Sequence, residues 1–149
     1  MKKAVVLVGT RPEAIKMLPV YLAFKKSKTI QPILVSTGQH KEMLLEVFNL
    51  FGIKPDIDLE LMSRDQSLSG ITSLLFLHLQ NVIDNVKPAI ILVQGDTSSA
   101  MVGGMVGFYN QIKVAHVEAG LRTYDKSSPF PEEVNRQVIG LVADLHFAP

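Results

Sequence analysis

Short runs of Val, Ile, Leu and Ala recur along the chain, and most of them are followed by a polar turn and a longer segment of helical spacing. Continuous apolar runs of this length are typical of strands buried on both faces of a parallel sheet. We therefore predict strands at residues 4–8, 33–35, 89–93, 114–117 and 145–148, with a shorter one at residues 59–61.

The segments between these runs are predicted to be helices. Thr10 stands three residues before Glu13, with Pro12 between them, which is a capping pattern for the first helix. The alternation of strand and helix predicts an α/β fold with a doubly wound parallel sheet, Rossmann-like, in one domain over residues 1–149. The predicted helices span residues 12–26, 41–51, 69–86, 98–109 and 132–142.

Composition excludes several classes of function. The 149 residues are enough for one domain with a sizeable core, and the net charge of +1 gives no electrostatic case for nucleic acid or a membrane surface. The absence of cysteine excludes a disulfide scaffold and a thiolate metal site, and it is compatible with the cytoplasm. No apolar run is long enough to span a bilayer, and no metal site is predicted.

Two acids follow predicted strands at the position where such sheets bind ligands. Ligands of doubly wound sheets lie outside the carboxyl ends of the strands. Asp96 follows the run at residues 89–93, and Glu118 follows the run at residues 114–117. If these strands are neighbours, both carboxylates reach one pocket and can divide acid and base roles. A helix N-cap for Asp96 and a solvated rim position for Glu118 are the structural alternatives.

Cations and polar groups follow the first two strands. Arg11 and Lys16 lie where a loop opens a helix, and free backbone N–H groups with two cations suit a phosphate. The loop has neither the dinucleotide fingerprint nor the Walker pattern, and a capped helix with solvated cations fits equally well. Gln39 and His40 lie in a polar turn that is explained more simply as the start of a helix.

The last predicted helix also begins with charged residues. Glu132 and Arg136 are four positions apart and share a helix face, so an exposed ion pair is the simplest interpretation. Glu133 is expected to be a solvated surface acid. Taken together, the placement of polar groups at strand ends favours an enzyme without identifying its reaction.

Five segments of the chain carry distinctive motifs: residues 9–17 (GTRPEAIKM), 38–40 (GQH), 94–97 (QGDT), 116–123 (HVEAGLRT) and 129–136 (PFPEEVNR). In their order and spacing, these segments resemble the non-hydrolysing UDP-N-acetylglucosamine 2-epimerases. The resemblance implies one half of a glycosyltransferase B-type two-domain fold. It implies exchange of UDP-N-acetylglucosamine and UDP-N-acetylmannosamine, by C2 proton removal, UDP elimination and UDP re-addition, with no cofactor and no metal.

The same resemblance assigns roles to the candidate residues. It implies acid and base function around C2 for Asp96 and Glu118, with Glu132 assisting the sugar or a proton transfer. It implies binding of the substrate or the departing diphosphate by three cations, which are Arg11, Lys16 and Arg136. A second, activating UDP-N-acetylglucosamine site is implied near Gln39 and His40, although Glu42, Arg64 and Asp65 nearby depart from the bacterial pattern.

Members of the family are more than twice as long as this chain. We therefore expect residues 1–149 to be the N-terminal half, with the C-terminal nucleotide-binding domain absent, inactive alone and homodimeric at full length. A hydrolysing 2-epimerase, which releases free N-acetylmannosamine, is the nearest alternative. A glycosyltransferase acceptor domain or a non-catalytic nucleotide-sugar-binding domain is a further alternative.

Overall fold

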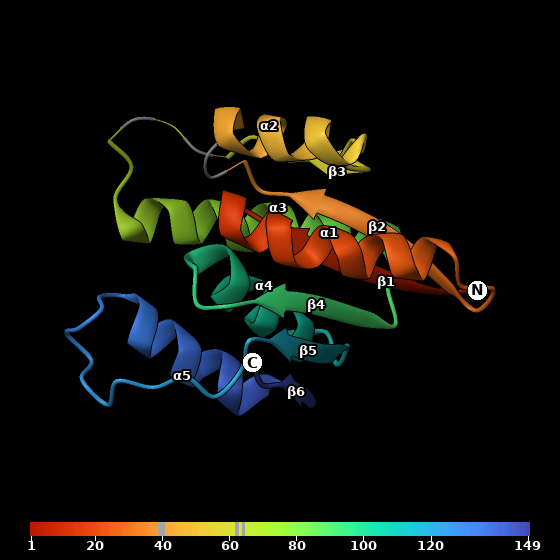
Figure 1. The fold of residues 1–149 in the computed structure, drawn as a ribbon. Helices are drawn as coiled ribbons and strands as arrows, with labels where there is room; N and C mark the ends of the chain where they lie inside the picture. Colours follow the sequence, from red (N-terminus) through yellow and green to blue (C-terminus); the bar gives the residue numbers. More distant parts are fainter. Residues whose placement is uncertain (39–40, 62, 64) are drawn as a thin grey trace.

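The structure is a computed structural model, and it describes residues 1–38, 41–61, 63 and 65–149. Among these residues, six parallel strands form one sheet with the order β3-β2-β1-β4-β5-β6, and five helices connect the strands (Figure 1). The elements are β1 (Lys2–Val8), α1 (Arg11–Lys25), β2 (Ile30–Ser36), α2 (Lys41–Phe51), β3 (Ile57–Asp58), α3 (Leu68–Val86), β4 (Ile90–Gln94), α4 (Ser98–Tyr109), β5 (Lys113–Val117), α5 (Glu132–Val142) and β6 (Leu145–Phe147).

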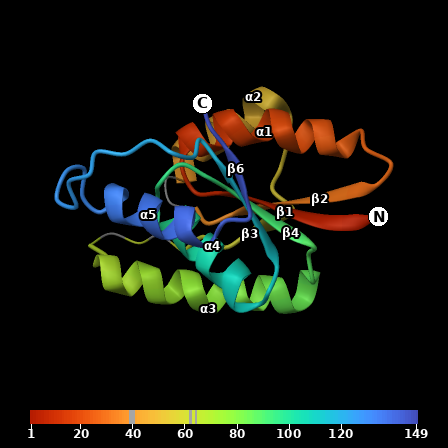
Figure 2. The ribbon, with the colours of Figure 1, turned by 90° about the horizontal axis from the view of Figure 1, so that it is seen from below.

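The strand order explains the placement of the helices. The chain builds outward from β1 to β3, and then α3 returns it to β4 on the other side of β1. With right-handed crossovers, the direction of building decides which face of the sheet each helix covers. Figure 2 shows α1 and α3 on opposite sides of the sheet. This is the strand order of a Rossmann fold, so the predicted fold class is confirmed.

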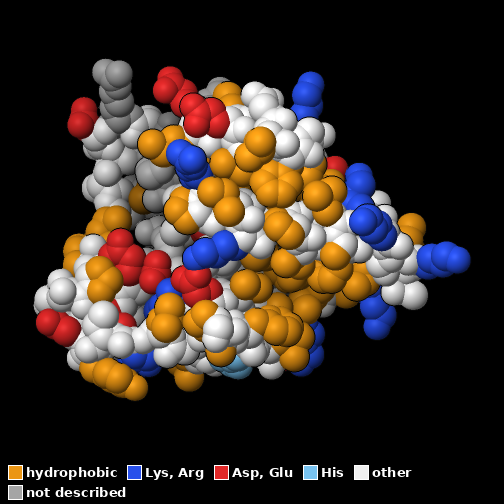
Figure 3. All heavy atoms as spheres, in the orientation of Figure 1, with side chains coloured by type: hydrophobic (Ala, Val, Ile, Leu, Met, Phe, Trp, Pro, Cys, Tyr) orange, Lys and Arg blue, Asp and Glu red, His pale blue; other side chains and the backbone are white. Residues whose placement is uncertain are grey.

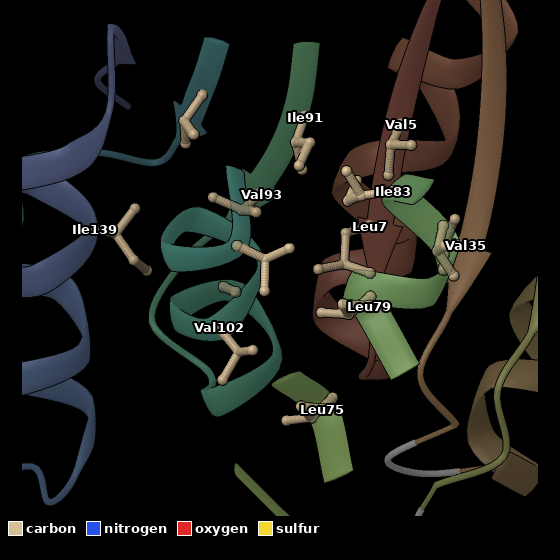
Figure 4. Packing of buried hydrophobic residues seen from close by; sticks show 14 of the residues in the cluster. Val5, Leu7, Val35, Leu75, Leu79, Ile83, Ile91, Val93, Val102 and Ile139 are labelled. Atoms are coloured by element: carbon tan, nitrogen blue, oxygen red, sulfur yellow. The ribbon is translucent and has the colours of Figure 1, made fainter. Parts of the chain in front are cut away.

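Each strand contributes to two separate cores because side chains alternate across the sheet. Val5 and Leu7 of β1 belong to one buried cluster with Leu79 of α3, Val102 of α4 and Ile139 of α5 (Figure 4). The other face of the sheet packs against α1 and α2. Its buried members are Ala4, Val6, Val8, Ala14, Met17, Leu18, Tyr21, Leu34, Leu44, Val47, Phe48, Leu92 and Ala115.

One predicted strand is wrong in position. The third strand is Ile57–Asp58, and not residues 59–61. Leu59 still donates its N–H to the Ser36 carbonyl, at 2.9 Å, but Glu60 has a φ of 47° and turns the backbone out of the extended conformation. The other predicted strands and helices are confirmed, although β2 begins at Ile30 rather than at residue 33. Within the described part of the chain, no helix has the length and apolarity to cross a membrane.

Glycines allow α4 to lie directly on the sheet. A Cβ atom on Gly107 would be 2.6 Å from Val114 Cγ2 and 3.2 Å from Ile91 Cδ1. Gly103 has equally little space, since a Cβ there would be 2.5 Å from Leu7 Cδ2. This close approach fixes the start of α4, which follows directly from the β4 loop, relative to the strand ends.

We expect Gly107→Ala to lower the free energy of unfolding by up to about 2 kcal/mol, which is the overpacking cost less the gain in helix propensity. The gain in helix propensity is about 1 kcal/mol, and overpacking against the stiff Val114 side chain costs about 1–3 kcal/mol. Gly140→Ala is the control, because Gly140 lies in α5 and a Cβ atom there would meet nothing within 4 Å. It should raise the free energy of unfolding by about 0.5–1 kcal/mol. Urea denaturation measures both, and equal effects would contradict the close packing of α4.

Candidate functional site

The site lies where the direction of sheet building reverses, between β1 and β4. These strands are adjacent and parallel, while the helices that follow them leave toward opposite faces. The divergence leaves a crevice at the carboxyl ends of the strands. Figure 3 shows acidic and basic side chains gathered at this edge, on the left of the view. The loops after β1, β4 and β5 supply its polar residues.

Arg136 of α5 connects the two candidate acids. Its Nη2 donates to Asp96 Oδ2 at 2.8 Å, and its Nε donates to the same oxygen at 3.3 Å. Arg136 also donates through Nη1 to the Glu118 carbonyl, and its Nη2 lies 3.5 Å from Glu118 Oε1. The Arg136 side chain is 6% exposed, so this cation is buried with both acids as partners. The expected convergence of Asp96 and Glu118 is therefore confirmed, and β4 and β5 are neighbours.

Asp96 is not the N-cap of α4, which was the alternative to a role in ligand binding. Thr97 is the N-cap of α4, and its side chain accepts from the Ala100 N–H at 3.0 Å. Asn135 Nδ2 donates to the Asp96 carbonyl at 2.9 Å, which adds a second link to α5. The Asp96 side chain is 32% exposed and therefore faces the crevice while it holds Arg136.

Glu118 lies just beyond β5 with a φ of 63°, a left-handed conformation that is uncommon for a residue other than glycine. Its Oε2 accepts a hydrogen bond from the ammonium group of Lys16, which reaches across from α1. The Lys16 side chain is 47% exposed and that of Glu118 is 22% exposed, so this pair lies at the surface of the crevice. Two carboxylates and two cations thus form one nearly neutral cluster from four elements.

Glu132 does not form the predicted ion pair with Arg136, because Arg136 turns to Asp96 and Glu118 instead. One carboxylate oxygen of Glu132, Oε2, is buried and has no hydrogen-bond partner among the residues that the structure describes. A buried acceptor without a donor is costly, and such groups often await a ligand or water. Glu132 begins the same helix that carries Arg136, but among the described residues its Oε2 atom has no donor.

The start of α1 differs from the predicted phosphate loop. Glu13 Oε2 accepts from the N–H groups of Gly9 and Thr10, at 2.8 and 2.6 Å, so these two donors are not free. Of the two interpretations left open for this loop, the capped helix is therefore the one that holds at Gly9 and Thr10, and Arg11 and Lys16 are exposed as expected. The remaining predicted residues, Gln39 and His40, lie outside the described residues, as does Arg64.

Glu133 is buried, and the expectation of a solvated surface acid is wrong. Its carboxylate accepts from Thr123 N–H at 3.0 Å, Arg122 Nε at 2.9 Å, Gln137 Nε2 at 3.1 Å and Tyr124 N–H at 3.3 Å. The backbone hydrogen bond from Thr123 is the main cause that lowers the pKa of Glu133 to about 2. Glu133 thus fastens the loop after β5 to α5.

His116 of β5 is also buried and links two strand ends. Its Nε2 lies 2.7 Å from the Gly95 carbonyl, so Nε2 carries the proton and donates to this acceptor. Burial is the main cause that lowers the pKa of His116, which keeps the ring neutral. Its Nδ1 has no hydrogen-bond partner within the described part of the chain. No group of His, Asp and Glu suited to a metal ion occurs among the described residues.

The fold and the site define a Rossmann-like domain with a charged cluster at the switch point. The chain belongs to a family described as UDP-N-acetylglucosamine 2-epimerase, whose pattern matches residues 22–149. A UDP-N-acetylglucosamine 2-epimerase of Bacillus subtilis is 51% identical over 147 residues, which is 99% of this chain and 39% of the relative.

Solved structures agree in fold. A structure described as S. aureus MnaA with UDP is 55% identical, with a TM-score of 0.96, covering 100% of this chain and 39% of that one. The Neisseria meningitidis UDP-GlcNAc 2-epimerase bound to UDP-GlcNAc is 46% identical, with a TM-score of 0.95, covering 99% and 40%. The expected likeness to the Rossmann-like half of a glycosyltransferase B-type fold is confirmed. The chain spans about two fifths of the length of these relatives.

The low pKa of Glu133 predicts a dependence of stability on pH. A depressed pKa, about 2 against an ordinary 4.5, means that the ionised group stabilises the fold above pH 4.5. This contribution is lost as the pH falls through about 2. The difference in unfolding free energy between wild type and Glu133→Gln should therefore shrink as the pH falls through this window. Glu46→Gln, at an exposed acid of α2, is the control, and a shrinkage of equal size there would contradict the assignment.

Proposed function

We propose that this chain is the N-terminal half of a longer cytoplasmic UDP-N-acetylglucosamine 2-epimerase and supplies its acid and base groups. The observation that carries the proposal is the meeting of Asp96 and Glu118 at one edge of the sheet, bridged by the buried Arg136. The identity of about half of all residues with named epimerases supports it. Its substrate, on this proposal, is UDP-N-acetylglucosamine.

The chemistry begins at C2 of the sugar. A carboxylate removes the C2 proton, the C–H electron pair forms the C1–C2 double bond, and the C1–O bond breaks to release UDP. Return of a proton to the other face of C2 and re-addition of UDP at C1 complete the inversion. Asp96 and Glu118 are the candidates for the two proton transfers, and Glu132, with its unpartnered oxygen among the described residues, is the candidate for assisting them.

Charge compensation on this path falls to the cations of the cluster. Departing UDP carries negative charge that develops as the C1–O bond breaks, and nearby cations stabilise such charge. Lys16 and Arg11 are exposed at the start of α1, so they are accessible to a diphosphate, while Arg136 is buried against the acids. The second, activating UDP-N-acetylglucosamine site implied near Gln39 and His40 stays a prediction.

We expect the complete polypeptide to introduce deuterium at C2 of intact UDP-N-acetylglucosamine in deuterated water, followed by NMR. Asp96→Asn and Glu118→Gln should each lower this exchange by about 100-fold or more, as expected for loss of an acid–base group. Glu46→Gln, at an exposed acid of α2 outside the cluster, should leave it unchanged.

Three outcomes separate the alternatives. Release of free N-acetylmannosamine would indicate the hydrolysing enzyme. The absence of both exchange and release would leave a nucleotide-sugar-binding domain or a transferase domain. Residues 1–149 expressed alone should show little or no exchange, and rapid turnover by them would contradict the proposal that a second half is required.

The complete protein is further proposed to be a homodimer that uses the outer surface of α3 and α4. Large apolar side chains are exposed there, and Phe76 stacks on Tyr109 with 6.1 Å between ring centroids. The exposed members are Leu74, Leu77, Phe108 and Tyr109. Leu77→Glu should shift the mass measured by analytical ultracentrifugation from dimer to monomer, whereas Leu50→Glu, at an exposed leucine of α2, should not.

A further inference from the structure

Glu13 is an acid that is almost completely buried below the crevice, at 2% exposure. Its Oε2 accepts from the N–H groups of Gly9 and Thr10, and its Oε1 accepts from the Thr97 hydroxyl at 2.7 Å. All three partners donate, which suits a carboxylate that is acceptor-only when ionised. Burial raises the pKa of Glu13, and these hydrogen bonds oppose that rise.

The hydrogen bond to Thr97 crosses the switch point of the sheet. Gly9 and Thr10 belong to the loop after β1, whereas Thr97 is the N-cap of α4 and follows Asp96 directly. The Thr97 hydroxyl accepts from the Ala100 N–H and donates to Glu13, so both of its roles are used. A capping box within α1 explains the contact with Thr10, but it does not explain the contact with Thr97.

A second contact strengthens this connection. Thr37 Oγ1, beyond the end of β2, lies 2.8 Å from Ser99 Oγ in the first turn of α4. A Cβ on Gly9 would lie 2.5 Å from Thr37 Oγ1 and 2.8 Å from Ser99 Oγ. The loops after β1, β2 and β4 are therefore packed together beneath the crevice, and the β4 loop cannot shift independently of the other two.

We propose that Glu13 is a positioning residue for Asp96. The Glu13 carboxylate binds the N–H groups at the start of α1 and also holds the β4 loop through the Thr97 hydroxyl. Asp96, the neighbour of Thr97, is thereby held in one geometry relative to Arg136 and the substrate. The N–H groups of Gly9 and Thr10 are thereby occupied by Glu13 and are not available to a phosphate. The effect on rate rests on the proposed epimerase function.

The test compares four variants of the complete polypeptide. Glu13→Gln keeps the shape but removes the charge, and Thr97→Val removes only the hydroxyl. Both should lower kcat about tenfold or more with KM nearly unchanged, because small misplacement of a reacting group is costly. Thr97→Ser keeps the hydroxyl and should restore most of the rate. Ser67→Ala removes the equivalent N-cap of α3, whose side chain accepts from Gly70 N–H, and should leave kcat unchanged.

A second readout does not depend on turnover. The NMR signal of Arg136 Nε–H reports its hydrogen bond to Asp96, and it should move in Glu13→Gln and Thr97→Val but not in Ser67→Ala. If the wild type shows no C2 exchange, the proposed function fails. The Arg136 signal would still test whether Glu13 and Thr97 position Asp96. An unmoved signal, a normal kcat in Thr97→Val, or an equal loss in Ser67→Ala would overturn the positioning role. Should Glu13→Gln fail to fold, the two Thr97 variants decide.

Discussion

The buried guanidinium of Arg136 is the interaction on which the arrangement of the site depends. Removing a cation from water is expensive unless its donors are matched by acceptors, and truncation of one partner leaves an uncompensated charge. Arg136 meets this requirement with the Asp96 carboxylate and with both the carbonyl and the carboxylate of Glu118. Because the planar fork directs its donors at fixed angles, α5 and the ends of β4 and β5 are held in one geometry.

This dependence gives the two acids a structural role besides the chemical one that we propose. Asp96 and Glu118 compensate a buried charge whether or not a substrate is bound, so the cluster is assembled in advance. Lys16 differs from Arg136, because it reaches Glu118 from α1 on a long, half-exposed side chain. A compact ammonium at the surface exchanges partners more readily than a buried fork. The cluster therefore combines one buried cation with one half-exposed cation.

Much of this architecture can be predicted from the sequence, because apolar runs and helix caps are local signals. The convergence of Asp96 and Glu118 follows from topology alone, once the strands are parallel neighbours. The burial of Glu133 escapes an assessment of single residues, although Glu133 shares a helix face with Arg136 and with other buried residues of α5. The link from Glu13 to Thr97 cannot be predicted, since a capping pattern carries no information about contacts across the sheet.

The four acids of this region differ in their hydrogen-bond donors and in their exposure to solvent. This difference distinguishes the acids that hold the fold from those proposed to react. The buried carboxylate of Glu13 accepts from two backbone N–H groups and the Thr97 hydroxyl, and that of Glu133 accepts from two backbone N–H groups and from the side chains of Arg122 and Gln137. Asp96 and Glu118 accept from side-chain cations and remain partly exposed. A carboxylate can exchange a proton with a ligand only if one of its oxygens is accessible and its hydrogen-bond donors can be displaced. Glu13 and Glu133 thus hold loops in place, whereas the partial exposure of Asp96 and Glu118 agrees with the acid and base roles proposed for them.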